Sequence, residues 1–272
     1  MKCSKEEQRK QKEQRLGETK YNNQGCLMKI VEYINHDNIF VEFQDEYRCR
    51  VHTKYSHFVS GGVRNPYRPN VFGIGIVGNK YPAKVDGVHT KEYKTWQGMI
   101  ARAYGQKAKE KRPKYKDVTC CEEWLLYENF YEWLHSQENF DKWYNGDLWA
   151  IDKDILVKGN KIYSPETCCL VPLNVNALFV KSDIRRGKYP IGVYFYKELN
   201  KFVAQISKRS KETNKYQQEC LGYYDTPEEA FQAYKEAKEF YIKQVAQEEY
   251  AKGNITKRCY VAMMNYEVEI TD

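Results

Sequence analysis

The sequence has no apolar run of about 18 residues, the length that a membrane-spanning helix needs. Residues 1–8 also lack the hydrophobic segment of a signal peptide. We therefore expect a cytoplasmic protein without a membrane partner.

Histidine is scarce, with five residues in 272, and they are not spaced as a cluster: His36, His52, His57, His89 and His135. We expect each to be a surface or packing residue, not a metal ligand. Cysteine is more frequent, but nine is an odd number, which suits a reducing compartment. The doublets Cys120-Cys121 and Cys168-Cys169 lack the two-residue gap of a zinc knuckle, so buried thiols are expected.

The composition excludes a disordered chain. Aromatic residues make up 15%, including 24 tyrosines, which is enough apolar area to offset chain entropy. At about 100–200 residues per domain, the length allows two or three domains. The 44 basic and 37 acidic residues give a charge of +7, which suits a polyanionic partner without identifying one.

The patterning predicts an α+β protein with five sections. Residues 1–16 form a charged arm, either a frayed helix or an extended basic segment. A small β-domain follows over 17–70, with strands over 27–34, 38–43 and 47–58. Residues 71–183 hold a Gly-rich hairpin (72–89), helices over 91–104 and 122–134, and a region with two short strands and a helix. Between those helices, the basic loop 107–114 could contact phosphates or be a solvated linker.

The C-terminal section, 184–250, reads as three antiparallel strands packed on one helix. The strand runs are 190–197, 201–209 and 216–224. Thr226, Pro227 and Glu229 supply a helix N-cap, a first-turn proline and a capping box. The tail, 251–272, ends in alternating apolar and charged residues that could form an edge strand.

This section resembles the plant ethylene-response (APETALA-type) DNA-binding domain, which also occurs in phage homing endonucleases. The resemblance rests on Gly192-Val193, Lys201-Phe202-Val203-Ala204-Gln205-Ile206, Leu221-Gly222-Tyr223-Tyr224-Asp225-Thr226-Pro227-Glu228-Glu229-Ala230 and Ala233-Tyr234. It implies a double-stranded DNA partner whose major groove receives the exposed sheet face. The residues that it places against DNA are Tyr194, Tyr196, Lys201, Val203, Gln205 and Ser207, with Lys208 and Arg209 at the rim.

One departure from that family concerns the arginines after its first Gly-Val, which are tyrosines here. The plant target sequence is therefore not expected, and stacking or sugar contacts are the expected roles of Tyr194 and Tyr196. The alternative is that these tyrosines only cover an outer sheet face.

The section from Asp147 to Lys181 resembles the ββα-metal (HNH, or His-Me finger) nuclease motif of phage homing-endonuclease-like proteins. In that family a histidine activates water, an asparagine holds the histidine, and a helix residue helps to bind one divalent metal. The family's spacing places these roles on Lys153, Thr167 and Asn176. Asp152 and Asn176 could still bind a metal through oxygen ligands, which would suit Mg²⁺.

Lysine is a poor substitute for the water-activating histidine. A free lysine side chain, with a pKa of about 10.4, is protonated at pH 7 and cannot accept a proton. We therefore expect a phage-type DNA-binding protein, in the host-cell cytoplasm, with a degenerate nuclease centre at Lys153 and Thr167. The alternatives are an active metal-dependent nicking endonuclease and a counter-defence inhibitor that binds a host protein.

Overall fold

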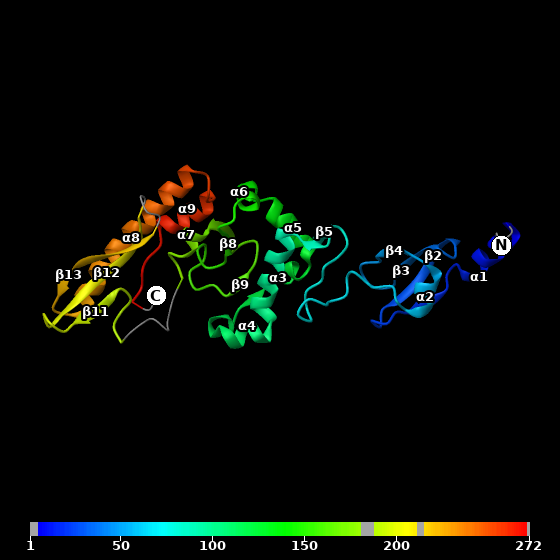
Figure 1. Cartoon of the computed structure of the whole chain (residues 1–272), viewed down its shortest axis with the longest axis horizontal. Coiled ribbons are helices and arrows are strands. Elements are labelled where there is room, and N and C mark those ends of the chain that lie inside the picture. Colours follow the sequence, from blue (N-terminus) through cyan, green and yellow to red (C-terminus); the bar gives the residue numbers. More distant parts are fainter. Residues whose placement is uncertain (1–4, 181–187, 211–214, 271–272) are drawn as a thin grey trace. The chain divides into compact units, whose positions relative to one another are not determined.

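The computed structural model describes residues 5–180, 188–210 and 215–270 and has an α+β fold (Figure 1). The chain divides into two compact units. Unit 1 comprises residues 1–111 and 122–131, and unit 2 comprises residues 112–121 and 132–272. In the described ranges, no helix combines the length and the apolar composition needed to cross a membrane.

Unit 1 begins with a four-stranded antiparallel sheet in the order β1-β2-β3-β4. Its strands are β1 (Thr19–Tyr21), β2 (Leu27–Asn35), β3 (Asn38–Phe43) and β4 (Arg50–Thr53). Buried residues alternate along β3 and, apart from a register shift between Ile30 and Glu32, along β2. They make the core: Met28, Ile30, Tyr33, Ile39, Val41 and Phe43. The sequence pattern thus predicted β2 and β3 well.

The strand predicted over residues 47–58 is wrong beyond Thr53, because the chain turns into helix α2 (Tyr55–Ser60). Tyr55 and Phe58, three residues apart, share one side of that helix, and Phe58 is fully buried in the sheet's core. The helix ends at Gly61, whose φ of 72° is left-handed and favours glycine. Aromatic residues that would suit a strand are therefore part of a short helix that packs on the sheet.

The charged arm forms helix α1 (Lys5–Arg15), and its last residue fixes it to the sheet. Arg15 Nη1 donates to Tyr33 Oη at 2.6 Å. Its guanidinium also lies 3.9 Å from the centre of the Tyr55 ring, within cation–π range. Helix α1 has no apolar stripe, so the contacts of Arg15 with Tyr33 and Tyr55 attach it to the rest of the unit.

Unit 1 also contains helices α3 (Lys91–Tyr104) and α4 (Gln106–Lys111), the 3₁₀ turn η2 (Glu123–Leu125) and the first five residues of helix α5 (Tyr127–His135). The helices over 91–104 and 122–134 were predicted; the loop over 107–114 is instead largely α4 and the 3₁₀ turn η1 (Pro113–Tyr115).

The Gly-rich hairpin predicted over 72–89 is also wrong, since only β5 (Lys84–Val85) and β6 (Val88–His89) pair within it. Its glycines serve close packing: a Cβ on Gly75 would lie 2.9 Å from Trp96, and one on Gly78 would lie 2.2 Å from Glu128. The Glu128 carboxylate accepts the backbone N–H groups of Asn79 and Lys80.

Unit 2 contains a small ββα arrangement. Strand β8 (Trp149–Asp152) pairs antiparallel with β10 (Cys169–Pro172), and helix α7 (Leu173–Asn176) follows. Beside it lie helix α6 (Phe140–Asn145) and the parallel pair of β7 (Thr119–Cys120) and β9 (Ile162–Tyr163). The two strands and helix expected after Asp147 are therefore present.

The C-terminal sheet has the order β11-β12-β13, with all pairs antiparallel: β11 (Val193–Tyr196), β12 (Lys201–Arg209) and β13 (Tyr216–Tyr224). Helix α8 (Pro227–Ala251) lies along it (Figure 1). The predicted capping box is confirmed: Thr226 accepts the N–H of Glu229, whose carboxylate accepts the N–H of Thr226.

The tail folds differently from the expected edge strand. Helix α9 (Lys257–Met264) packs on α8, and residues 265–270 form no strand. The Val268 N–H donates to the Glu239 carboxylate of α8, and Val268 is buried. Side-chain anchoring to α8 replaces strand pairing.

Candidate nucleic-acid interface

The two faces of the C-terminal sheet differ in what they contact. Ala204 and Ile206 point into the core that includes Ala230 and Tyr234 of α8. Because strand residues alternate, Val203, Gln205 and Ser207 point to the opposite face. The strand register adds Tyr194 and Tyr196 of β11 and Gln218, Cys220 and Tyr223 of β13. We call this helix-free side the outer face.

Aromatic side chains dominate one half of the outer face. Tyr194 and Tyr223 are 45% and 54% exposed, and the Tyr196 and Tyr223 rings lie 6.2 Å apart. Val203 pairs with both Tyr194 and Tyr223 and is only 1% exposed. The expected contact of Val203 with DNA stays a prediction, but the side chain is buried between its two cross-strand tyrosines and offers no exposed surface.

The polar groups at this end are paired with each other. Lys201 forms an ion pair with Asp225, and the Tyr196 hydroxyl bonds to Glu198. That hydrogen bond raises the pKa of Tyr196 above its usual value. Tyr196 is thus a neutral donor at physiological pH, and Lys201 can reach a phosphate only by leaving Asp225.

The other half of the outer face carries uncharged hydrogen-bonding groups. Gln205 and Ser207 are half-buried, and Gln218 and Cys220 opposite them are exposed. An amide offers both donors and an acceptor, which suits the edge of a base. Gln218 and Tyr223 were absent from the sequence-based prediction; their cross-strand pairing with Ser207 and Val203 identifies them.

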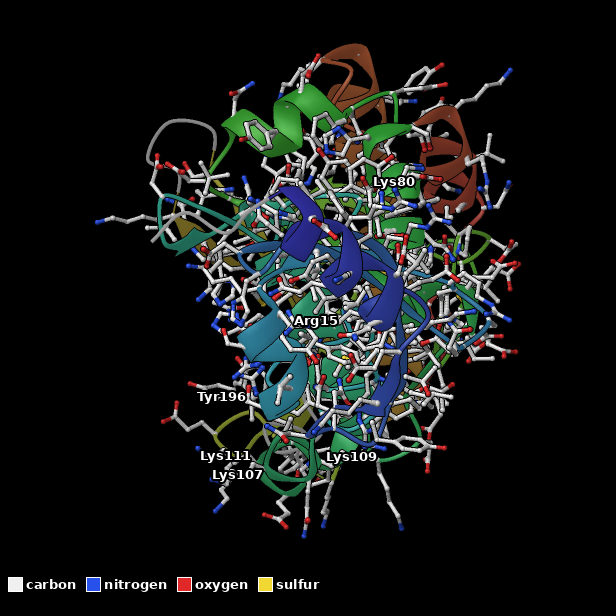
Figure 2. The ribbon with its side chains drawn as sticks, turned by 90° about the vertical axis from the view of Figure 1, so that its right-hand side faces the viewer. Arg15, Lys80, Lys107, Lys109, Lys111 and Tyr196 are labelled. Atoms are coloured by element: carbon white, nitrogen blue, oxygen red, sulfur yellow. The ribbon has the colours of Figure 1, made fainter. Side chains whose placement is uncertain are left out.

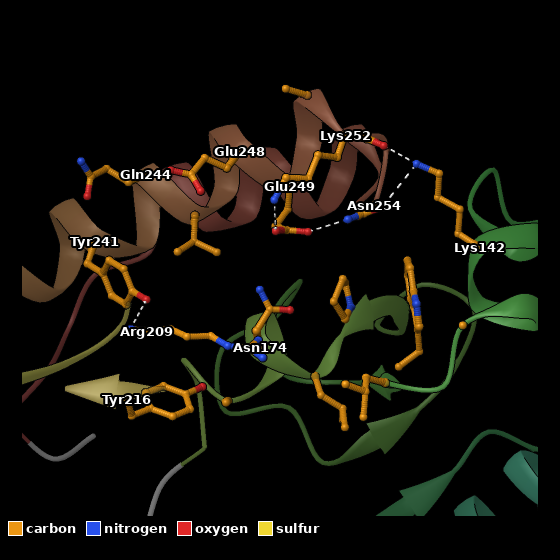
Figure 3. Close-up of a pocket in the computed structure, with 18 of the residues that line it drawn as sticks. Lys142, Asn174, Arg209, Tyr216, Tyr241, Gln244, Glu248, Glu249, Lys252 and Asn254 are labelled. Atoms are coloured by element: carbon orange, nitrogen blue, oxygen red, sulfur yellow. Dashed lines mark hydrogen bonds and ion pairs between the residues drawn. The ribbon is translucent and has the colours of Figure 1, made fainter. Parts of the chain in front are cut away.

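Lys208 and Arg209 do not form a free basic rim. Lys208 Nζ lies 2.8 Å from the Glu219 carboxylate. Arg209 lines a groove of about 1500 Å³ between the C-terminal half of α8 and the ββα region, and its side chain points toward Asn174 (Figure 3). The Arg209 backbone N–H donates to Tyr241 Oη at 2.9 Å.

The buried carboxylate in that groove is already satisfied. Glu249 accepts hydrogen bonds from Lys252 Nζ at 2.9 Å and Asn254 Nδ2 at 2.7 Å (Figure 3). Burial raises the pKa of Glu249, but these bonds outweigh burial and leave the pKa below its usual value. Glu249 therefore joins α8 to the turn after it.

The residues at the nuclease positions are engaged in local structure. Lys153 is buried; its ammonium pairs with Asp154 and donates to the Asn160 carbonyl at 3.0 Å. Both contacts use the amino group as a donor, so it faces hydrogen-bond acceptors in its own loop and not a water to be activated. Thr167 Oγ1 donates to the Ile162 carbonyl at 2.7 Å, which fixes the loop before β10.

The expected metal ligand Asp152 takes part in local structure. Asp152 Oδ1 accepts the N–H groups of Asp154 and Ile155 at 2.7 and 2.8 Å, so the carboxylate caps the turn after β8. Burial raises the pKa of Asp152, against those two bonds. The part of the chain that the structure describes contains no group of three or more His, Cys, Asp or Glu residues that could hold a metal ion. Asn176 makes no side-chain hydrogen bond to Asp152 within residues 5–180.

Comparison with protein-family models, curated proteins and solved structures gave no match.

Proposed function

We propose that the chain binds double-stranded DNA through the outer face of the β11-β12-β13 sheet and does not cut it. The observation that carries this proposal is the outer face itself: exposed tyrosines and amides, on a sheet whose other face is covered by α8. The resemblance to an APETALA-type domain supports the same partner.

The chemistry of the face suggests how it would bind. Gln205 and Gln218 can each form two hydrogen bonds to adenine in the major groove. Tyr194 and Tyr223 offer ring faces and hydroxyls to sugars and phosphates. With Lys201 of this face, and Lys208 near it, in ion pairs, the sheet would derive affinity from base and sugar contacts more than from charge.

Fluorescence anisotropy with labelled duplexes, drawn from a pool selected for binding, tests the interface. We expect Gln205→Ala to weaken binding by about 10-fold, within the range of about 1–3 kcal/mol for a base contact. Tyr194→Ala with Tyr223→Ala should also weaken it. The control is Tyr21→Ala, an exposed tyrosine of unit 1. Equal effects of all the variants, or no duplex binding at any salt concentration, would overturn the proposal.

The second half of the proposal concerns cleavage. Supercoiled plasmid incubated with Mg²⁺ or Mn²⁺ should stay intact, since the Lys153 side chain is bonded to Asp154 and to the Asn160 carbonyl. Nicks that form with wild type and vanish with Asp152→Ala or Asn176→Ala would establish an active nuclease instead. If the wild-type protein does not bind DNA at all, the counter-defence alternative remains. A pull-down from host lysate would then test for a host-protein partner.

A further inference from the structure

Helix α4 (Gln106–Lys111) presents positive charge at the surface of unit 1. Its sequence, QKAKEK, has three lysines, and none of its residues is buried. Lys107 and Lys111 are exposed and Lys109 is half-buried. Figure 2 shows the three labelled together at the lower edge of the view.

The lysine charges of α4 destabilise the helix that carries them. Lys107 and Lys111 are four residues apart, where like charges face each other and destabilise a helix. Within the described ranges neither has an ion-pair partner, and Glu110 bonds to Gln106 at 2.9 Å. An external anion beside α4 would therefore remove repulsion instead of displacing an internal partner.

We propose that α4 is a second DNA contact, one that binds backbone phosphates without reading sequence. The proposal rests on the proposed function, but its site belongs to unit 1 and the outer face to unit 2. Lys107 and Lys111 lie about 6 Å apart along the helix axis, from the rise of about 1.5 Å per residue. Each DNA strand carries one charge per about 3.4 Å, so these lysines can meet about two phosphates.

The composition of α4 favours nucleic acid over a membrane surface. A helix that binds in the lipid interface needs a large apolar face. The apolar residue of α4 is Ala108, which adds little area. Lysine suits phosphate as a mobile point charge with three donors, and such contacts are independent of base sequence.

The salt dependence of binding separates the two contacts. In the variant Lys107→Gln, Lys109→Gln and Lys111→Gln, we expect the slope of log affinity against log salt to fall by about 2–3, or about 0.9 per phosphate. Base preference should not change. Glutamine keeps a similar helix propensity, and circular dichroism checks the fold.

The matched control removes three exposed lysines of unit 1 elsewhere: Lys20→Gln, Lys29→Gln and Lys84→Gln. An equal fall in slope in the two triple variants would show a net-charge effect and overturn the α4 contact. An unchanged slope in the α4 variant, with duplex binding intact, would overturn it while leaving the outer face in place. No binding by wild type would overturn both proposals. Phosphatidylglycerol vesicles serve as a second arm: if the α4 variant loses vesicle binding but keeps the wild-type DNA slope, α4 belongs to a membrane contact.

Discussion

Lys238 provides a test of how α8 packs in unit 2. It stands one helical turn from Tyr234 and from Ile242, both of which are buried, and so occupies the middle of the helix's core stripe. Among the described residues its ammonium has no hydrogen bond or ion pair. Burial lowers the pKa of Lys238 from 10.5 to about 8.

The pKa shift sets the size and sign of the expected effect. A lysine whose pKa is lower in the folded state destabilises that state when it is charged. The protein therefore has its full stability above the unfolded pKa of 10.5 and loses stability as the pH falls through about 8. The difference between these two values is about 2.5 units, which corresponds to about 3 kcal/mol at pH 7. Between pH 7 and pH 10, Lys238 should therefore raise the free energy of unfolding by about 2.5 kcal/mol.

We expect Lys238→Met to remove the destabilisation that the buried ammonium causes at pH 7. Methionine has a similar length and no charge, so the free energy of unfolding at pH 7 should rise by about 2–3 kcal/mol. At pH 10 the gain should shrink below about 1 kcal/mol, since most of the lysine in the folded protein is then neutral. Urea unfolding at the two pH values, followed by circular dichroism, measures both differences.

The control is Lys243→Met on the same helix, which shows whether any lysine-to-methionine change in α8 has the same effect. If Lys238→Met destabilises the protein at pH 7, or gives an equal gain at pH 7 and pH 10, the desolvated-ammonium reasoning is refuted. Because variant and wild type are compared at the same pH, the titration of other groups contributes equally to both and cancels.

Three further predictions concern single side chains, each measured by urea unfolding. Asp152→Asn keeps the turn's acceptor and removes a buried charge, so stability at pH 7 should hold or rise, whereas Asp152→Ala should lose about 1–3 kcal/mol; equal losses would show that the carboxylate itself is required. Gly192→Ala should cost about 2 kcal/mol or more, because its φ is 75° and a Cβ would lie 2.1 Å from Tyr234; a smaller loss would mean that Tyr234 moves freely. Thr226→Ala should cost about 1 kcal/mol by removing the N-cap of α8, and no loss would make the cap redundant.

The parts of the fold predicted correctly are those whose signals are local. Strands β12 and β13 have the predicted bounds, and α8 begins at the capping box around Thr226. Alternation of apolar residues also located β2 and β3. Each of these patterns can be read within one element, because it depends on the period of that element and on its caps.

The errors arise where distant residues decide the structure. Phe58 fills the core of the first sheet from a helix, which the strand-like run around it conceals. Gly75 and Gly78 are required by Trp96 and Glu128, so a hairpin was the wrong explanation of that glycine pattern. Val203 has the correct face, but its burial depends on tyrosines from two other strands.

The composition of the outer face depends on one irregularity in β13. Gln218 and Tyr223 are five residues apart, so strict alternation would place them on opposite faces. Leu221 is unpaired between Cys220 and Gly222, and this β-bulge shifts the alternation by one residue. Both side chains therefore reach the outer face, where Gln218 stands beside Ser207 and Tyr223 beside Val203. Because β12 has no inserted residue, its outward residues followed from the pattern, whereas those of β13 required the register.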